Sequence, residues 1–390
     1  MKVLVINSGS SSLKFQLFEM PQEKVLVKGL AERIGEKIGK FKANDFVVEK
    51  PLATHKKALE LLTEYLLNPE NKIIDSKEEI KIVGHRVVHG GNKFVEPTLI
   101  TAEVKEKIKE LFSLAPLHNP ANLTGIITAE EIFPKAKQVA IFDTAFHQSI
   151  PVKNHKYAIP EKFYEEGIRK YGFHGISHQY VSREANKRLG KEKSRLITLH
   201  LGNGASATAV WNGKSYDTSM GFGPMNGLIM GTRSGDIDQS IIFYMLDKMG
   251  YSSAEVQNIL NKKSGMMALA GSNDLRDIET AAEKGDEKAR LALEMYAGAI
   301  KKYIGNYIAQ MNGLDALVFT AGIGENSDVV RKMVTDDMNY MGISIDSNKN
   351  KNPQKYNGDI SDASSQVKVF VIPTNEELEI AKQSYNLVAK

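Results

Sequence analysis

Two stretches of the sequence, residues 3–18 and 196–210, follow one pattern: two β-prone apolar runs flank a short turn of glycine and polar residues. The first reads VLVINSGSSSLKFQLF and the second reads LITLHLGNGASATAV. In the first, Leu13, Phe15 and Leu17 alternate with polar residues, as in a half-buried strand. A flexible linker would not be followed by a second strand of this kind, so each stretch predicts a β-hairpin. The repeat predicts two domains of similar core, each opening on a hairpin.

The rest of the chain predicts mixed strands and helices. At 390 residues it is long enough for two domains. Buried strands are expected at 137–143 and 315–320, and a strand and a helix at the C-terminus. Helices are expected at 54–67, 101–113, 122–132 and 286–311. The longest should begin after Asp286, end at Asn312-Gly313, and bury one side, with Leu291, Met295, Ile300, Ile304, Ile308 and Met311 among its buried positions. This order of elements is typical of an α/β protein.

Composition excludes several classes of protein. The net charge is only +4 and the lysines are scattered, so we expect no nucleic-acid partner. There are no cysteines, which excludes disulfides, thiolate catalysis and cysteine-ligated zinc. The N-terminal apolar run, residues 3–6, is shorter than the ~7–15 residues of a signal-peptide core. We therefore expect a cytoplasmic protein with no membrane partner.

Three glycine turns carry the first indication of function. They lie at residues 7–12, 202–206 and 322–326, and the third joins a strand to a new helix. Glycine lets backbone N–H groups approach a phosphate closely. One such turn alone is typical of an ordinary hairpin, but two hairpins followed by strand, Gly-x-Gly and helix are more specific. The order resembles the sugar kinase, actin and chaperone ATPase superfamily. That resemblance implies two RNase H-like α/β domains with a nucleotide in the cleft between them.

Ten short motifs narrow the resemblance to the acetokinase family, and they occur in order along nearly the whole chain. They are NSGSSSLKF (7–15), GHRVVHGG (84–91), APLHNPAN (115–122), FDTAFH (142–147), YGFHG (171–175), HLGNGAS (200–206), DTSMGF (217–222), MGTRSGD (230–236), TAGIGEN (320–326) and PTNEE (373–377). The resemblance implies magnesium-dependent, reversible, direct in-line phosphoryl transfer from ATP to acetate, giving acetyl phosphate and ADP. It also implies a homodimer. We expect an acyl- and phosphate-binding domain at 1–145 plus 377–390 and a nucleotide-binding domain at 146–376.

The chemistry implied by this resemblance is electrostatic, because a carboxylate must approach a polyanion. Acetate is already ionised at neutral pH, so no general base is needed. Arg86 and Arg233 suit a cationic clamp, since the planar guanidinium fits carboxylate and phosphoryl oxygens. An alternative is that Arg86 is an ion-pair partner in the core. The resemblance assigns His174 to stabilising the transferred phosphoryl group and makes Asp143 catalytic. We expect Asp143 to orient an arginine or metal-bound water.

The resemblance implies three further sets of binding residues. The pocket for acetate is implied at Val88, Leu117, Phe173 and Pro224, with Arg86 and His118 beside it. The nucleotide is implied at Ser12, Lys14, His200, Leu201, Gly202, Asn203, Gly204, Asp274, Leu275, Arg276, Gly322, Ile323, Gly324, Glu325 and Asn326. Asn7 and Glu376 are implied to hold Mg²⁺, with Mn²⁺ as a substitute. Outside this family, Lys14 would be a solvated strand residue and Glu376 an acid that complements a helix dipole.

Several alternatives remain open at this point. The chain departs from the family at Gly223, Asn226 and Gln239, near the acyl pocket, so a propionate or butyrate kinase is the nearest alternative. A second is a nucleotide-dependent binding module resembling actin, although such a module needs no carboxylate clamp. A third is a zinc hydrolase using His85 and His89, but the flanking valines and glycines favour a strand, on which positions i and i+4 lie too far apart.

Overall fold

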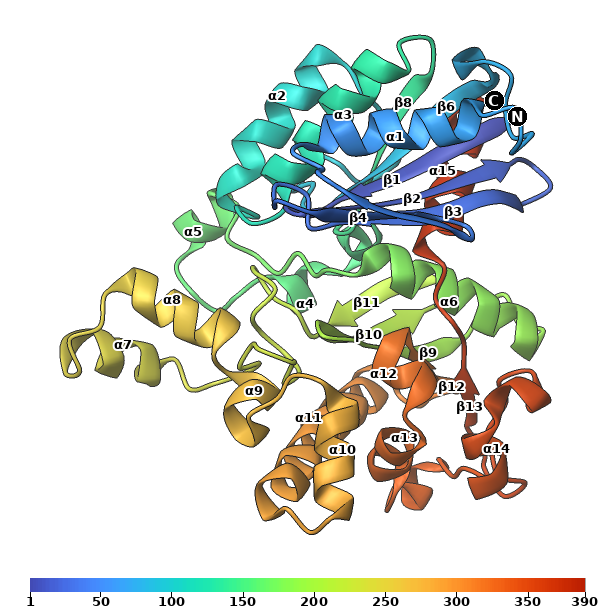
Figure 1. The fold of residues 1–390 in the computed structure, drawn as a ribbon. Helices are drawn as coiled ribbons and strands as arrows, with labels where there is room; N and C mark the ends of the chain where they lie inside the picture. The colour runs from blue at the N-terminus through green and yellow to red at the C-terminus, as the bar shows by residue number, and fades with distance from the viewer. Residues whose placement is uncertain (390) are drawn as a thin grey trace. The chain divides into compact units, whose positions relative to one another are not determined.

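The computed structural model describes residues 1–389, and the chain divides into two compact units. Unit 1 comprises Met1–Ala145 and Asn375–Lys390, and unit 2 comprises Phe146–Thr374. The sequence led us to expect divisions after residue 145 and near residue 376. Unit 1 therefore contains both ends of the chain, and unit 2 is inserted between the two segments of unit 1 (Figure 1).

Unit 1 is built on an eight-stranded sheet with the order β5-β4-β3-β2-β1-β6-β8-β7. β1 pairs antiparallel with β2 and parallel with β6, and β6 pairs parallel with β8. The strands are β1 (Lys2–Ser8), β2 (Ser12–Glu19), β3 (Lys24–Glu32), β4 (Gly39–Ala43), β5 (Phe46–Lys50), β6 (Ile80–Val87), β7 (Thr98–Leu99) and β8 (Lys137–Phe142).

The opening hairpin is a tight turn, as the sequence predicted. Asn7 lies opposite Lys14 in the register of β1 and β2, and the Gly9 N–H donates to the Ser12 carbonyl at 2.9 Å. The Nε2–H of His55 donates to the Gly9 carbonyl at 2.7 Å and fixes the turn from α1 (His55–Leu67). The interpretation of residues 8–12 as a flexible spacer is therefore wrong.

Helices cover both faces of this sheet. α1 and α3 (Asn119–Ile132) share a hydrophobic core with one face, which includes Leu4, Ile6 and Val83. α15 (Glu376–Val388) packs against β1, β6 and β8. A Cβ built on Gly84 would point at Ser384 and Ile380 of α15, so α15 covers the opposite face from α1 and α3. Figure 1 shows this arrangement within unit 1.

Two predicted helix boundaries in unit 1 differ from the structure. The helix expected at 101–113 is α2 (Ala102–Glu110), and it tightens into a 3₁₀ turn at Leu111–Ser113. The helix expected at 122–132 begins at Asn119. Pro120 lies in its first turn, where the missing N–H would have no intrahelical partner. Proline therefore belongs to the start of this helix and does not interrupt the chain before it.

Unit 2 contains a five-stranded sheet with the order β11-β10-β9-β12-β13. Its strands are β9 (Arg195–Leu201), β10 (Ala205–Trp211), β11 (Lys214–Thr218), β12 (Ala316–Thr320) and β13 (Lys368–Val371). The hairpin β9-β10 extends antiparallel to β11 on one side and parallel to β12 and β13 on the other. The strands β3-β2-β1-β6-β8 of unit 1 have the same order and directions. The predicted duplication of two similar α/β cores is confirmed.

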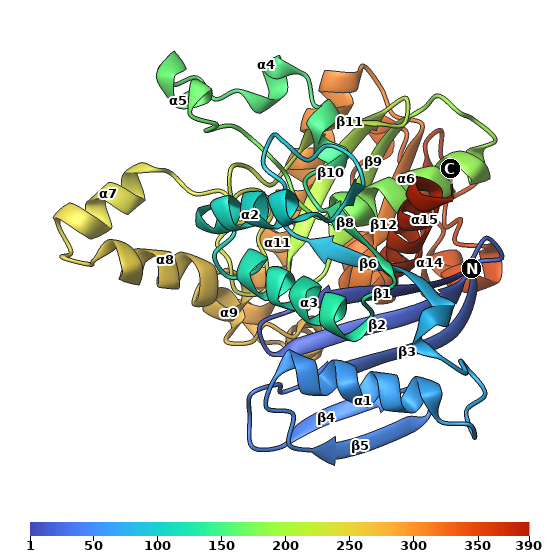
Figure 2. The ribbon, with the colours of Figure 1, turned by 90° about the horizontal axis from the view of Figure 1, so that it is seen from above.

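The helices of unit 2 pack around this sheet, and their bounds are as follows: α4 (Val152–His155), α5 (Glu161–Glu165), α6 (Gly175–Leu189), α7 (Ser240–Asp247), α8 (Ser253–Lys262), α9 (Gly265–Ala270), α10 (Leu275–Glu283), α11 (Glu287–Met311), α12 (Ala321–Asn326), α13 (Asp328–Thr335) and α14 (Ser347–Lys351). α6 packs against β9 and β12, and α11 packs against β9 and β10. Figure 2 shows α7 and α8 projecting from the rest of unit 2 as an arm. Within residues 1–389, no helix combines the length and apolar character that a membrane crossing requires.

The buried side of α11 was predicted only in part. The helix begins after Asp286, and Asn312 ends it with φ +54°, as expected. Ile300, Ile304 and Met311 are buried and Ile308 is half-buried. Leu291 and Met295 are exposed, because the buried side of this part of the helix is formed by Ala289, Ala292, Leu293, Tyr296 and Ala297.

The packing of α15 on β6 can be tested through Gly84. A Cβ at this position would lie 2.7 Å from Ser384 Oγ and 2.9 Å from Ile380 Cγ2, so Gly84→Ala should destabilise unit 1 by ~1–3 kcal/mol. The Ser384 hydroxyl is buried without a hydrogen-bond partner, so Ser384→Ala alone should cost little. The double variant should recover part of the loss in urea unfolding. Strict additivity of the two changes would contradict this packing.

Candidate functional site

Unit 2 contains a pocket of about 700 Å³ that joins three separate segments. The first is the turn between β9 and β10, the second is the start of α10, and the third is α12 at the end of β12. The lining residues are Gly202, Asn203, Asn273, Asp274, Leu275, Arg276, Glu279, Gly322, Ile323, Asn326 and Ser327. Eight of the residues implied for the nucleotide line this pocket.

Local structure explains why these segments leave an open pocket. A Cβ built on Gly322 would meet no atom within 4 Å, so a side chain there would project into free space. Asp274 caps α10 by accepting the Arg276 N–H at 3.0 Å, and it also accepts from the Arg276 guanidinium at 2.5 Å. That pairing lowers the pKa of Asp274. The pocket therefore combines a wall without side chains and a charged rim.

The other residues implied for the nucleotide lie elsewhere. Leu201 is buried, and Gly204 and His200 flank the pocket turn without lining the pocket. The Glu325 carboxylate accepts the N–H groups of Ala321 at 2.9 Å and Thr374 at 3.0 Å. Gly324 provides a carbonyl that Arg331 binds at 2.9 Å. Glu325 and Gly324 thus fix the shape of the third segment from behind.

Ser12 and Lys14 belong to unit 1. Ser12 is the first residue of β2, and the Lys14 ammonium lies 2.7 Å from the Glu377 carboxylate. Lys14 therefore has a partner at the start of α15 while its side chain stays 56% exposed, and its implied role at the nucleotide stays a prediction.

Four residues around the pocket were missed from the sequence. Asn273, Glu279 and Ser327 line it, and the Ser327 hydroxyl donates to Glu279 at 2.5 Å. Arg331 of α13 is fully buried and donates to the carbonyls of Gly324 and Glu325 and to Asn350. Nothing in the sequence around Arg331 indicates that its side chain is buried. Its burial depends on contacts with Asn350, which lies nineteen residues further along the chain.

His174 and Arg233 lie together at the inner end of the pocket turn. A Cβ built on Gly204 would lie 3.4 Å from His174 Nε2 and 3.8 Å from Arg233 Nη1. Gly204 follows Asn203, which lines the pocket. The two predicted catalytic side chains of unit 2 therefore both lie within 4 Å of the place that a Cβ on residue 204 would take.

The charge of Arg233 has no carboxylate partner in the described part of the chain. Its Nη1 donates to the Pro224 carbonyl at 3.0 Å and lies near the Met230 sulfur. Burial lowers the pKa of the guanidinium, and no charged neighbour acts against that shift. The guanidinium still carries its charge at neutral pH. A half-buried cation without a counter-ion is an attractive site for an anion.

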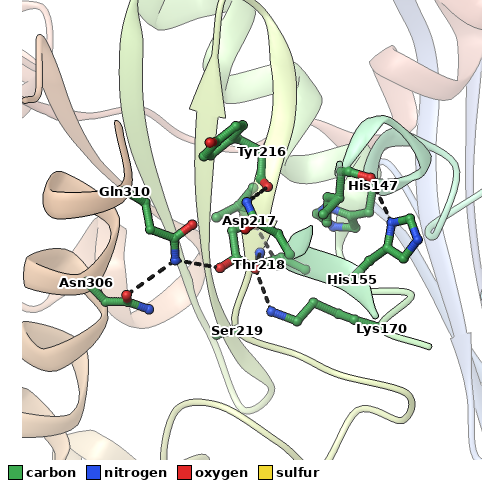
Figure 3. Close-up of polar contacts among 12 residues, drawn as sticks. His147, His155, Lys170, Tyr216, Asp217, Thr218, Ser219, Asn306 and Gln310 are labelled. Atoms are coloured by element: carbon green, nitrogen blue, oxygen red, sulfur yellow. Dashed lines mark hydrogen bonds and ion pairs between the residues drawn. The ribbon is translucent and has the colours of Figure 1, made fainter. Parts of the chain in front are cut away.

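The segment that carries Phe173 and His174 is held firmly. His174 has a left-handed backbone with φ +57°, a conformation that a non-glycine residue adopts only when its surroundings impose it. The Nε2–H of buried His147 donates to the Phe173 carbonyl at 2.9 Å. Figure 3 shows Lys170 and Gln310 converging on Asp217, to whose carboxylate they donate at 2.5 and 2.8 Å. These contacts anchor the segment just before His174.

Unit 1 contains the other predicted catalytic pair, Arg86 and Asp143. Arg86 at the end of β6 donates to Asp143 with Nε at 3.1 Å and Nη2 at 2.6 Å. Burial opposes the charge on Arg86, but the carboxylates of Asp143 and Glu376 hold the pKa of the guanidinium above its ordinary value. Burial raises the pKa of the Asp143 carboxyl against the opposing pull of Arg86. Asp143 thus orients an arginine, and Arg86 is also the ion-pair partner that the alternative interpretation foresaw.

The residues implied for the acyl pocket are divided between the two units. In unit 1, Val88 is buried, Leu117 is 60% exposed, and the charge of His118 acts on Asp143. In unit 2, Phe173 is buried and Pro224 is the carbonyl partner of Arg233. Neither unit by itself therefore carries all four predicted apolar side chains.

The donor set of Asn7 and Glu376 fits magnesium. Both side chains are half-buried and offer hard oxygen donors, of which Mg²⁺ needs only a few beside its waters. α15 begins at Glu376 and packs against β1, which carries Asn7. Glu376 also acts electrostatically on Arg86 and Asp143. These two residues therefore could hold a metal ion near that pair.

His85 and His89 have other partners. His85 lies on β6, and its Nε2–H donates to Gln138 Oε1 at 2.8 Å. The Nδ1 of His89 accepts the backbone N–H of Gly91 at 3.0 Å. Among residues 1–389, no group of three or more His, Asp or Glu side chains is arranged to hold a metal ion.

Comparison with known proteins identifies relatives over the whole chain. A model of the acetokinase family matches residues 2–382. The acetate kinase of Flavobacterium johnsoniae is 56% identical over 393 residues, with 100% of both chains covered. Two crystal structures are similar: acetate kinase of Porphyromonas gingivalis (44% identity, TM-score 0.92, 99% of each chain) and a propionate kinase of Francisella tularensis (46%, 0.93, 99% of this chain and 100% of that one).

The buried histidine behind Phe173 predicts a pH dependence of stability. Burial lowers the pKa of His147 to about 4, whereas it titrates near 6.5 when unfolded. The unfolded state therefore binds more protons between these values, and acidification from pH 7 to 4.5 should cost ~2 kcal/mol through this group. His147→Gln keeps an N–H donor but does not titrate. Its free energy of unfolding should therefore fall by ~2 kcal/mol less than that of the wild type over the same pH range. Urea unfolding followed by the single tryptophan, Trp211 in β10, measures this, and equal losses in both proteins would contradict it.

Proposed function

The chain belongs to the acetokinase family, and we propose that it transfers the γ-phosphoryl group of ATP to acetate, giving acetyl phosphate and ADP. The observation that carries this proposal is the unpaired charge of Arg233 beside His174, next to a glycine-walled pocket. A nucleotide in the pocket would direct its terminal phosphate toward Gly204. We place the reaction in the cytoplasm, where ATP is available.

The proposed mechanism is charge neutralisation by positioned cations. Acetate enters as an anion, so the enzyme must reduce its repulsion by the phosphates. We propose that Arg233 of unit 2 and Arg86 of unit 1 bind the transferring group and the acetate, and that His174 donates a hydrogen bond to a phosphoryl oxygen. Asp143 binds the edge of the Arg86 guanidinium that carries Nε and Nη2, and so fixes the orientation of its plane.

We propose Asn7 and Glu376 as the residues that hold magnesium. A bound Mg²⁺ supplies further neutralisation of the phosphate charge. Asn7 would contribute its amide oxygen and Glu376 its carboxylate. Ser12 and Lys14 follow on the same hairpin, and Ser10 and Ser11 in its turn are exposed, so we propose that their backbone N–H groups bind a phosphate.

The choice of acid is proposed to depend on a small apolar pocket made by Val88, Leu117, Phe173 and Pro224. One extra methylene changes selectivity by only ~10–200-fold in such a pocket. A propionate kinase among the similar structures is consistent with that narrow margin. Trapping the acyl phosphate as a hydroxamate with acetate, propionate and butyrate will rank the three acids by kcat/KM.

Removal of the Arg233 charge tests the central assignment. Arg233→Ala should lower kcat for acetyl phosphate formation by about 10³-fold, comparable to the loss of an arginine that stabilises a phosphoryl-transfer transition state. ATP affinity should change little. Arg233→Lys should recover only part of the rate, because an ammonium group cannot reproduce the planar, bidentate fork of a guanidinium.

Arg290→Ala is the matched control, since Arg290 is exposed on α11 and its guanidinium pairs, among residues 1–389, with Glu294 alone. It should retain the full rate. Near-normal turnover of Arg233→Ala would exclude the proposed role.

The pocket in unit 2 predicts a selective effect on the nucleotide. Gly322→Leu would place a side chain in free space of the pocket, and the backbone there does not require glycine. We expect the KM for ATP to rise at least about tenfold, as for the loss of one good hydrophobic or stacking contact, while the KM for acetate stays unchanged. Gly298→Leu on α11, where a Cβ also meets no atom, controls for the cost of the substitution. Equal ATP kinetics in the two variants would place the nucleotide elsewhere.

We propose that the protein is a homodimer, as the family resemblance implies, and that the arm of unit 2 forms the interface. None of the residues of α7 is buried, and Phe243 and Tyr244 are 63% and 62% exposed. Ile241, Met249 and Tyr251 add to this apolar surface. So much exposed apolar area on one projecting helix supports burial against a second copy.

Light scattering after size-exclusion chromatography tests this proposal. The double change Phe243→Ser and Tyr244→Ser should convert the dimer to a folded monomer. Tyr340→Ser is the control, because Tyr340 is 76% exposed but lies on a different segment. A monomeric wild-type protein, or a dimer unaffected by the double change, would contradict the interface.

A further inference from the structure

A line of buried hydrogen bonds runs from His174 into the core of unit 2. Ser206 Oγ lies 2.9 Å from His174 Nδ1 and 2.7 Å from His178 Nε2. Thr198 Oγ1 lies 2.7 Å from His178 Nδ1. Ser206, His178 and Thr198 are all completely buried, so water does not replace any of these bonds.

Each bond in this line has one hydrogen to share, so the bonds must all point the same way. A hydroxyl has a single hydrogen, and a neutral imidazole carries a hydrogen on only one of its two nitrogens. His178 is neutral, because burial holds its pKa well below the ordinary value. In the described part of the chain Ser206 Oγ contacts only these two rings, so if it accepted from both, its own buried hydrogen would have no acceptor. With a neutral His174, Ser206 therefore donates to one histidine and accepts from the other. The direction at Thr198 decides the direction of the whole line.

The contacts of Thr198 set that direction. Its hydroxyl can donate to His178 Nδ1 at 2.7 Å or to the Thr208 carbonyl at 3.5 Å. The second distance is at the limit of a hydrogen bond, so the hydrogen belongs to the first. The Nε2–H of His178 then donates to Ser206 Oγ, and the Ser206 hydroxyl donates to His174 Nδ1. His174 is left with its hydrogen on Nε2.

We propose that His178 is a positioning residue that acts through Ser206 to keep the hydrogen of His174 on Nε2, the nitrogen that lies near Arg233 at Gly204. The proposal rests on the proposed function only for the consequence that Nε2 donates to a phosphoryl oxygen. If these hydrogen bonds ran in the opposite direction, the hydrogen of His174 would be on Nδ1. Nε2 would then present a lone pair to an anion and could not donate a hydrogen bond to it. A histidine held in the wrong tautomer can cost several orders of magnitude in rate.

His147 offers an internal comparison with the same chemistry. Its Nδ1 lies 2.8 Å from Ser215 Oγ, but its Nε2 faces the Phe173 carbonyl, which can only accept. The carbonyl alone therefore fixes the tautomer of His147, with or without Ser215. Ser206 and Ser215 are both buried serines that hydrogen-bond to the Nδ1 of a histidine. Of these two, Ser206 also hydrogen-bonds to a second histidine, His178.

Nitrogen-15 NMR of the histidine side chains tests the tautomers directly in the wild-type protein. Two-bond and three-bond couplings distinguish a protonated Nε2 from a protonated Nδ1, and His174→Asn and His178→Asn assign the two signals among the nine histidines. We expect both rings to carry the hydrogen on Nε2. A hydrogen on Nδ1 of either ring reverses the line and overturns the proposal.

Kinetics of two matched variants provide the second measurement. Ser206→Ala should lower kcat at least about tenfold with the KM for ATP unchanged, and should allow the His174 signal to report a mixture of tautomers. Ser215→Ala should remain within twofold of wild type. Equal effects of the two changes would overturn the proposal. If instead His174→Asn keeps the full rate while the NMR result holds, the proposed function of His174 fails and the tautomer assignment stands.

Discussion

The unpaired charge of Arg233 is the constraint on which the functional organisation of unit 2 depends. Burial works against a guanidinium without a counter-ion, and here only the Pro224 carbonyl and a methionine sulfur support it. Stability alone would favour a carboxylate beside it or an apolar residue in its place. The desolvation of this guanidinium therefore lowers the stability of the surrounding loop, and a bound anionic substrate can offset that free energy. Arg86 differs from Arg233, because Asp143 binds the guanidinium of Arg86 through both Nε and Nη2 and so fixes its orientation.

The neighbourhood of Arg233 is rigid for related reasons. His174 has a strained left-handed backbone. A hydrogen bond from His147 to the Phe173 carbonyl and one between Ser206 and the His174 ring hold this segment. On the opposite side of the pocket, Arg331 and Glu325 bind the backbone of the segment that carries Gly322. Glycine provides the open space, and buried polar side chains keep that space in shape. Such fixed polar groups suit phosphoryl transfer, because groups that are already in place need not reorganise as charge shifts during the reaction.

The sequence predicted the parts of the fold that depend on local pattern. Alternation at Leu13, Phe15 and Leu17 predicted the first hairpin, and its echo at 196–210 predicted the duplicated sheet. The glycine turns, through the family resemblance, indicated eight of the residues that line the pocket. The implied roles of Arg86, Arg233 and His174 remain predictions, although the structure brings His174 and Arg233 together at Gly204.

The remainder depends on contacts between distant segments, which pattern does not encode. Leu291 and Met295 have the right spacing for burial, but Ala292, Leu293 and Tyr296 next to them are the residues that α11 buries. Lys14 looks solvated on its strand until Glu377 is placed beside it. Arg331 and the line from His174 to Thr198 join residues that nothing in the sequence relates, because each bond depends on how α6, α13 and the sheet pack.

The central claim is that Arg86 and Arg233 together neutralise the transferring phosphoryl group. A crystal structure of the enzyme with ADP, a metal fluoride that imitates that group, and acetate tests this claim most directly. The account predicts that both guanidinium groups donate hydrogen bonds to the fluoride or to the acetate oxygens bound to it. A complex in which either side chain points to solvent while the ligands are bound would contradict it.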